Sequence, residues 1–148
     1  MDHAFQREQQ NSIKNKRPLC LIMLDVDFFK NYNDRHGHLA GDAVLQFISQ
    51  QLRDQLRPHD SLARFGGEEF VILLPNLSLP EAAQVAERLR SCLAKFSRIP
   101  NSQPTLPGVT ISLGVAEFSP EDQLNCLVHK ADQAKQQGRN RACVYNMQ

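Results

Sequence analysis

The sequence predicts an α+β sandwich with a largely antiparallel sheet of five strands. Three observations support this fold class: two apolar, strand-like segments flank a Gly-Gly pair, single apolar strands alternate with amphipathic helices, and a hairpin lies in the middle of the chain. A doubly wound parallel sheet would need a crossover helix where the hairpin lies. The 148 residues can bury a sound core, so we expect residues 1–148 to form a single domain.

The first half of the chain contains a surface helix, a buried strand and a long amphipathic helix. Residues 2–16 are polar with few apolar positions, which is compatible with a helix on the surface. The continuous apolar run at residues 19–24 suits a central strand that is buried on both faces. A polar connection is expected over residues 31–38. The next helix spans roughly residues 39–56, with its apolar stripe at Val44, Leu45, Ile48, Leu52 and Leu56.

The second half begins with the hairpin around Gly66-Gly67, whose glycines supply the positive φ angles that tight hairpin turns need. A helix follows Pro75, because Ser78 and Glu81 have the spacing of a capping box and Pro80 suits a first helical turn. The remaining elements are a loop over residues 97–108, a half-buried strand at 109–115, a helix at about 120–137 with Gly138 as its C-cap, and a last strand at 142–145.

The composition is that of an ordinary globular protein, with 41% hydrophobic residues and a net charge of +1. This charge gives no global field that would attract DNA, RNA or a membrane surface. No apolar run approaches the roughly 18 residues of a membrane span, and the polar start is unlike a signal peptide. The four cysteines are widely spaced, which favours reduced thiols and a cytoplasmic location (Cys20, Cys92, Cys126 and Cys143).

Acidic residues occur at two places where an ordinary fold would not favour them. Asp25 and Asp27 follow the buried strand at alternate positions and would share one face, and Glu68 and Glu69 follow the hairpin turn directly. Solvation of a strand end and of a hairpin tip is the plainer interpretation. If the two strands are neighbours, however, Asp25 and Glu68 meet at one edge. With the Val26 carbonyl they would make a hard oxygen site for Mg²⁺ or Mn²⁺.

A ligand of such a site would carry phosphates, and the turn glycines would let it approach the backbone. Carboxylates alone would repel a triphosphate, so cations must also be present. The candidates are Lys30, Lys135 and Arg139. Lys135 and Arg139 stand near the end of a predicted helix, where the helix dipole alone also favours basic residues. The dipole likewise explains Asp42 in the first turn of its helix.

These residues carry a resemblance to a known family. Gly66-Gly67-Glu68-Glu69-Phe70 resembles the signature of the GGDEF family, the diguanylate cyclases, and the match spans about residues 1–147. Further segments match the family in order and spacing: 25–30, 33–34, 36–42, and Lys135 with 138–140. The resemblance implies an antiparallel five-stranded sheet wrapped by helices, similar to adenylyl cyclase and polymerase palm domains, which agrees with the element order above.

The resemblance implies that two GTP condense to cyclic di-GMP and release two pyrophosphates, each 3′-hydroxyl attacking the other α-phosphate. Catalytic residues would be Asp25, Glu68 and Glu69, with Glu69 serving the reacting hydroxyl or ribose. Two divalent ions per site, Mg²⁺ or Mn²⁺, would be held by Asp25, the Val26 carbonyl and Glu68, with Asp27 as a supporting ligand. The expected substrate contacts are Phe28, Phe29, Lys30, Asn33, Asp42, Leu45, Gly67, Lys135 and Arg139.

Within this set, Asn33 and Asp42 would recognise guanine, because a carboxylate accepts hydrogen bonds from groups that adenine lacks. Leu45 would floor the base pocket. The backbone amides of Phe28 and Phe29 would hold phosphates, together with Lys30, Lys135 and Arg139. The segment Arg57-Pro58-His59-Asp60 matches the R-x-x-D of the family's inhibitory product site, where an arginine forks onto bound cyclic di-GMP, and Arg88 is an expected helper.

The chain departs from the family pattern in two places. The customary Asp-x-Leu-Thr-Gly-Leu segment is absent before the first helix, so Arg64 loses a usual partner and the guanine pocket loses part of its wall. The usual Ala-Leu-Tyr is absent before Lys135, as if about one helical turn were deleted. We also expect this chain to be a fragment of a larger signalling protein whose sensor or dimerising domain is missing. Anchoring of the full-length protein to a membrane is compatible with this expectation. Catalysis would need a homodimer.

Three functions remain open on the sequence alone. The first is an active diguanylate cyclase with product feedback inhibition. The second is a catalytically inactive domain that binds GTP or cyclic di-GMP as a receptor, against which the intact Asp25, Glu68 and Glu69 argue. The third is a cyclase of altered product, such as a hybrid cyclic dinucleotide, against which the guanine-reading Asp42 argues.

Overall fold

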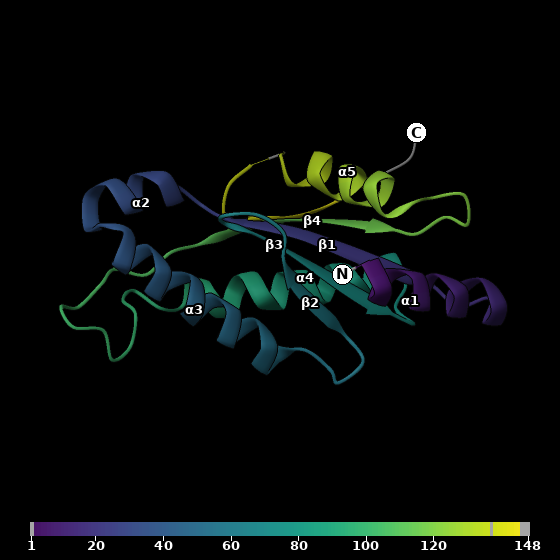
Figure 1. The fold of residues 1–148 in the computed structure, drawn as a ribbon, viewed down its shortest axis with the longest axis horizontal. Helices are drawn as coiled ribbons and strands as arrows, with labels where there is room; N and C mark the ends of the chain where they lie inside the picture. Colours follow the sequence, from purple (N-terminus) through teal and green to yellow (C-terminus); the bar gives the residue numbers. More distant parts are fainter. Residues whose placement is uncertain (1, 137, 146–148) are drawn as a thin grey trace.

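The five strands form one mixed sheet with the order β2-β3-β1-β4-β5, seen in the computed structural model, which describes residues 2–136 and 138–145 (Figure 1). Three of its pairings are antiparallel, whereas β4 and β5 run parallel. The α+β class and the largely antiparallel sheet are therefore confirmed. The strands are β1 (Leu19–Val26), β2 (Ser61–Arg64), β3 (Glu69–Pro75), β4 (Ile111–Glu117) and β5 (Ala142–Val144).

The helices are α1 (Asp2–Asn15), α2 (Phe29–His36), α3 (His38–Gln55), α4 (Leu79–Ala94) and α5 (Leu124–Lys135). The expectation of a polar connection at 31–38 is wrong, because α2 occupies most of it. Phe29 and Tyr32 form the buried side of this short helix, and Phe28 precedes it in the left-handed conformation. The helix expected at 120–137 begins later, at Leu124, and its C-cap is Gln136 instead of Gly138.

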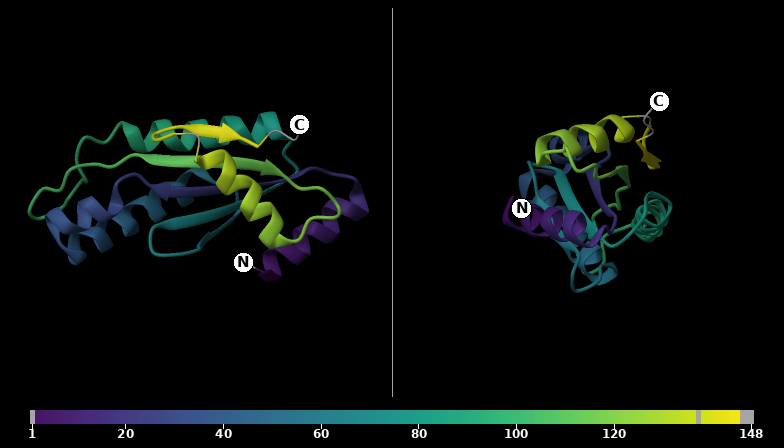
Figure 2. Two further views of the ribbon diagram at one scale, coloured as in Figure 1. Left: turned by 90° about the horizontal axis from the view of Figure 1, so that it is seen from above. Right: turned by 90° about the vertical axis from the view of Figure 1, so that its right-hand side faces the viewer.

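The sheet has a hydrophobic core on each face. Alternate β1 residues such as Ile22 and Leu24 pack on one side with α3 and α4, while Leu21 and Met23 pack on the other side with α1 and α5. Figure 2 shows the helices distributed on both sides of the sheet. The β1 strand is therefore buried on both faces, as the apolar run predicts. Among the described residues, no helix is long and apolar enough to cross a membrane.

The α5 helix lies unusually close to β4 because Gly114 faces it. A Cβ at Gly114 would lie 1.8 Å from the Ala131 carbonyl oxygen and 2.5 Å from the Lys135 nitrogen. Only glycine leaves room for this helix backbone. The contact fixes the C-terminal end of α5 beside the end of β1, because Gly114 pairs with Met23 and Ser112 pairs with Asp25.

Thiol reactivity is expected to differ sharply between Cys20 and Cys126. Burial, followed by the charges of Glu117 and Glu81, raises the pKa of Cys20 to about 12, and its thiol donates to the Leu77 carbonyl at 3.3 Å. Cys126 is exposed on α5. Because the thiolate is the reactive form, alkylation of the native protein at pH 8 should modify Cys126 and spare Cys20. Peptide mass spectrometry checks this, and modification of Cys20 without unfolding would contradict it.

Candidate active site

The C-terminal end of β1 lies beside the hairpin between β2 and β3. We call this end of the sheet the acidic edge. Asp25 pairs with Glu69 of β3 and with Ser112 of β4. The Val26 amide donates to the Glu68 carbonyl at 3.3 Å, and the Phe65 amide closes the turn onto the Glu69 carbonyl at 2.8 Å. The structure thus places the expected catalytic acids at the same edge, although they come from segments far apart in the sequence.

The electrostatics of Glu68 show that its carboxylate lies within a cluster of charges. Burial raises the pKa of Glu68, and the negative charges of Asp25 and Glu69 raise it further. The nearby cations Lys135 and Arg139 act in the opposite direction. Three carboxylates and two cations therefore converge on this edge, an arrangement that is costly for a surface with no ligand.

Lys135 at the end of α5 is held between two acids. Its ammonium group lies 3.1 Å from Asp25 Oδ2 and 3.0 Å from Asp132 Oδ1, and only 9% of its side chain is exposed. Burial lowers the pKa of Lys135, but the hydrogen bonds and charges of Asp132 and Asp25 outweigh it and raise the pKa overall. Asp132 was not among the predicted site residues, and its signal is its i,i+3 spacing from Lys135.

Asp27 lies deeper and is satisfied by other residues. Thr110 Oγ1 donates to its Oδ2 at 2.6 Å, the Asn140 amide donates to the same oxygen at 2.9 Å, and the Ser112 hydroxyl donates to Oδ1. These bonds fasten the end of β1 to β4 and to the segment before β5. The role of Asp27 as a supporting metal ligand stays a prediction. Two hydroxyl residues at alternate positions, Thr110 just before β4 and Ser112 within it, were the signal for this arrangement.

The donor set suits a hard divalent cation. Carboxylate and carbonyl oxygens are the ligands such ions prefer, and backbone pairing brings the segments of Asp25, Val26 and Glu68 to one edge. The role of these residues as metal ligands stays a prediction. Burial raises the pKa of Glu68 most, and the charges of Asp25 and Glu69, which a cation would offset, raise it further. The described residues form no group of three or more His, Cys, Asp or Glu side chains already arranged around one ion.

Two clefts open near this edge. The first, of about 430 Å³, is lined by Asp25, Ser112, Lys135, Gln136, Gly138 and Arg139. Phe28 and Lys30 follow Asp25 closely in the sequence and are exposed around the start of α2, whereas Phe29 is buried. The guanidinium carbon of Arg139 lies 5.0 Å from the centre of the Phe28 ring. This cleft therefore combines an acidic end with two of the three expected phosphate-binding cations.

The second cleft, of about 450 Å³, lies between α3 and the hairpin and is lined by Asp42, Leu45, Arg64 and Phe70 among others. Asn33 is not part of its lining. Its side chain packs against Gly41, where a Cβ would lie 1.7 Å from Asn33 Oδ1. That oxygen is buried and accepts no hydrogen bond from the described residues, so the contact of Asn33 with guanine stays a prediction.

Arg64 holds the hairpin turn itself. The sequence predicted only that Arg64 lacks its usual partner from the absent segment before the first helix. Its guanidinium donates to the Gly67 carbonyl at 2.6 Å through Nη2, and Nε also faces the carbonyls of Gly66 and Gly67. A Cβ at Gly67 would meet no atom within 4 Å. The backbone there is therefore open to close approach.

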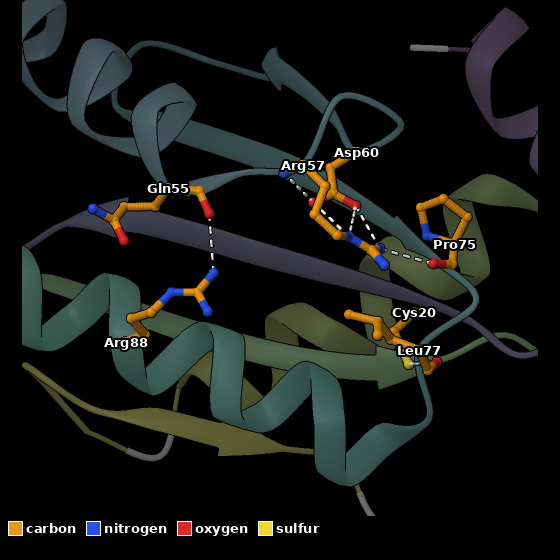
Figure 3. A network of polar contacts seen from close by, with 7 residues as sticks. All are labelled: Cys20, Gln55, Arg57, Asp60, Pro75, Leu77 and Arg88. Carbon is orange, nitrogen blue, oxygen red and sulfur yellow. Dashed lines mark hydrogen bonds and ion pairs between the residues drawn. The ribbon is translucent and has the colours of Figure 1, made fainter.

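The residues of the expected inhibitory site come from the connection between α3 and β2, which carries Arg57 and Asp60, and from α4, which carries Arg88 (Figure 3). Arg57 donates to Asp60 through Nε and through Nη2, at 2.7 Å for the latter, and Nη2 also donates to the Pro75 carbonyl at 2.8 Å. The hydrogen bond with Asp60 is the main cause that raises the pKa of Arg57. Arg88 of α4 donates to the Gln55 carbonyl at 2.9 Å.

Comparison with known proteins matches residues 1–142 to the family model described as "Diguanylate cyclase, GGDEF domain". The chain is 40% identical to Diguanylate cyclase A of Treponema denticola over 97% of its length, and 44% identical to Diguanylate cyclase DgcP of Pseudomonas aeruginosa over 95%. It spans only 39% and 21%, respectively, of the length of these two relatives.

Solved structures agree with these matches. The GGDEF domain of DgcB from Caulobacter crescentus, in complex with c-di-GMP, superposes with a TM-score of 0.88 and 28% identity over 99% of this chain and 86% of that one. The active GGEEF domain of a diguanylate cyclase from Vibrio cholerae gives a TM-score of 0.83 and 30% identity over 99% of this chain and 92% of that one. The similarity thus covers nearly the whole sheet and its helices.

Proposed function

Because the chain belongs to the GGDEF family of diguanylate cyclases, we propose that it condenses two GTP molecules into cyclic di-GMP and releases two pyrophosphates. The observation that carries this proposal is the convergence of Asp25, Glu68 and Glu69 with Lys135 and Arg139 at one sheet edge. Inactive relatives that act only as receptors would have no need for this costly cluster of charges.

Each residue in the cluster has a distinct task in the proposed reaction. Asp25, Glu68 and the Val26 carbonyl would hold divalent cations, which when bound supply activation of a hydroxyl and stabilisation of the leaving pyrophosphate. Glu69 would orient the ribose and its hydroxyl. Lys135 and Arg139 line the neighbouring cleft and would offset the charge of the β- and γ-phosphates. The identity of the ions, Mg²⁺ or Mn²⁺, and their number, two per site, are part of the proposal.

Guanine would occupy the cleft between α3 and the hairpin. Asp42 lines this cleft and can accept hydrogen bonds from the N1–H and exocyclic amine of guanine, and Leu45 offers an apolar surface to the ring. Asn33 lies outside the lining of this cleft, so it would have to move to reach the base. Adenine would leave the Asp42 acceptors without donors, which is the physical basis for its rejection.

A symmetric product requires two copies of the chain, each bringing one GTP. The two sites would face each other so that each 3′-hydroxyl reaches the α-phosphate held by the partner copy. Joining two copies by a dimerising segment gives effective concentrations on the order of mM. At μM concentration the free chain would therefore work slowly without such a segment, so slow turnover alone would not count against the site.

The deciding experiment incubates the chain, fused to a dimerising coiled coil, with GTP and Mg²⁺ and identifies the products by mass spectrometry. We expect cyclic di-GMP and pyrophosphate, and no cyclic product from ATP alone. GTP binding without any product across protein concentrations would instead make the domain a receptor. A mixed guanine–adenine dinucleotide formed from equal GTP and ATP would overturn the assigned base specificity.

Product feedback at Arg57 is a further part of the proposal. Asp60 and the Pro75 carbonyl hold the Nε and Nη2 side of the guanidinium, so its Nη1 edge is presented outward with 39% of the side chain exposed. The two N–H groups of Nη1 remain to donate to a guanine or phosphate of cyclic di-GMP. Arg88 of α4 donates to the Gln55 carbonyl, and in Figure 3 it does not contact Arg57.

Replacing Arg57 with alanine should abolish inhibition by added cyclic di-GMP while leaving the initial rate close to wild type. Initial rates measured over a series of product concentrations check this. Because Arg57→Ala also leaves the buried Asp60 carboxylate unpaired, Arg57→Ala with Asp60→Asn serves as a second variant that removes this charge. The exposed Arg98→Ala is the matched control. Inhibition that is unchanged in both Arg57 variants would remove this site from the proposal.

A further inference from the structure

The segment that carries Arg139 is anchored through its backbone. The Asn140 amide donates to Asp27 Oδ2 at 2.9 Å and to Ser112 Oγ at 3.2 Å, while Arg90 of α4 donates to Asn140 Oδ1 at 3.0 Å. Asn140 adopts a left-handed φ of 49°, a conformation that asparagine tolerates well. The Cα position of Arg139 is therefore set by β1, β4 and α4 together.

The guanidinium of Arg139 lacks comparably firm contacts. Its side chain is 60% exposed, and its ion pair with Asp27 Oδ1 spans 4.0 Å, the limit of such an interaction. A long, exposed side chain loses much rotamer freedom when a ligand fixes it. Something must restrain Arg139 if it is to meet a phosphate in a defined place.

The Phe28 ring is in the right position to restrain it. The guanidinium carbon lies 5.0 Å from the ring centre, within the range of a cation–π contact. Burial does not account for this phenylalanine, because it is 60% exposed. It also adopts a φ of 57°, which is unfavourable for a large side chain and is compatible with a position selected for its contacts.

We propose that Phe28 is a positioning residue: its ring is a platform that holds the Arg139 guanidinium over the cleft lined by Asp25 and Lys135, ready for the terminal phosphates of a nucleoside triphosphate. This inference rests on the proposed function. Phe28 acts through Arg139, so its side chain should matter for ligands with β- and γ-phosphates and not for a nucleoside monophosphate.

The test compares binding of GTP and GMP by calorimetry in the presence of Ca²⁺, for the chain and its Phe28→Leu, Phe28→Tyr and Phe28→Trp variants. A cation–π contact at an exposed site corresponds to roughly a two- to fivefold change in a binding constant. Phe28→Leu should therefore weaken GTP binding by that factor and leave GMP binding unchanged. Phe28→Tyr and Phe28→Trp should restore GTP binding, because both rings can hold the guanidinium.

A double-mutant cycle with Arg139→Ala separates positioning from a general structural effect. Phe28→Leu should have no further effect on GTP binding once Arg139 is alanine. An equal loss for GTP and GMP, a loss that persists in the Arg139→Ala background, or unchanged GTP binding in Phe28→Leu would each overturn the positioning role alone. Failure of the wild-type chain to bind GTP at all would overturn the proposed function as well.

Discussion

Replacing Glu68 with glutamine is expected to reduce cyclic di-GMP formation by at least about a hundredfold, the usual cost of removing one charge-stabilising group from an active site. Glutamine keeps the shape of the side chain but not its charge. Glu68 is the acid whose pKa responds to burial, Asp25, Glu69 and both cations, so it stands where the charges of the site meet. Initial rates of product formation by the dimerised chain measure the loss.

The same variant should bind divalent cations more weakly while its fold is retained. Mg²⁺ that binds the native state raises the melting temperature, and this rise should shrink in Glu68→Gln. Without Mg²⁺ the variant should melt no lower than wild type, because the substitution removes repulsion from Asp25 and Glu69. Glu117→Gln is the matched control, because Glu117 lies at the end of β4 that is far from Asp25. A Glu68→Gln rate within tenfold of wild type would contradict the assigned role.

Replacing Gly114 with alanine should destabilise the protein by about 3 kcal/mol, the upper part of the range for overpacking, because the added methyl group meets the α5 backbone. For a chain of this size that corresponds to a melting temperature lower by roughly 6–12 °C. Displacing α5 would also separate Lys135 from Asp25, so product formation should fall together with stability.

Gly67→Ala is the matched control for stability, because a methyl group there meets no atom within 4 Å. Thermal unfolding followed by circular dichroism compares the three proteins. A Gly114→Ala melting temperature within about 2 °C of wild type would show that α5 can shift at little cost, less than the ~1 kcal/mol such a shift in temperature represents.

The fold was predictable wherever local periodicity decides the structure. The apolar run of β1 and the stripe of α3 each specify their element from neighbouring residues alone. The hairpin was predicted at the right place, but the positive φ angles expected of Gly66 and Gly67 are wrong: residues 65–68 connect the strands, and neither glycine lies in the positive-φ region. The short helix α2 was missed because its sequence is polar on most sides. Only Phe29 and Tyr32 mark its buried side, and their burial depends on α3.

The acidic edge was predictable for the same local reason: acids at a strand exit and after a hairpin turn meet if the strands are neighbours. What the sequence could not supply were contacts between distant segments. Thr110 reaches Asp27 across 83 positions, and Lys135 reaches Asp25 across 110. Such pairs depend on how helices and strands pack, which no local pattern encodes. The parallel direction of β5 is of the same kind, because it follows from where α5 returns the chain.

The two outer strands of the sheet are very short, with four residues in β2 and three in β5. They leave few free amides and carbonyls in a row, so another chain gains little by adding itself as a sixth strand. Encounters between copies are thereby directed to surfaces other than the sheet margins. That favours brief, reversible meetings of copies over permanent fusion, as the proposed reaction between two copies would require if its product is to escape.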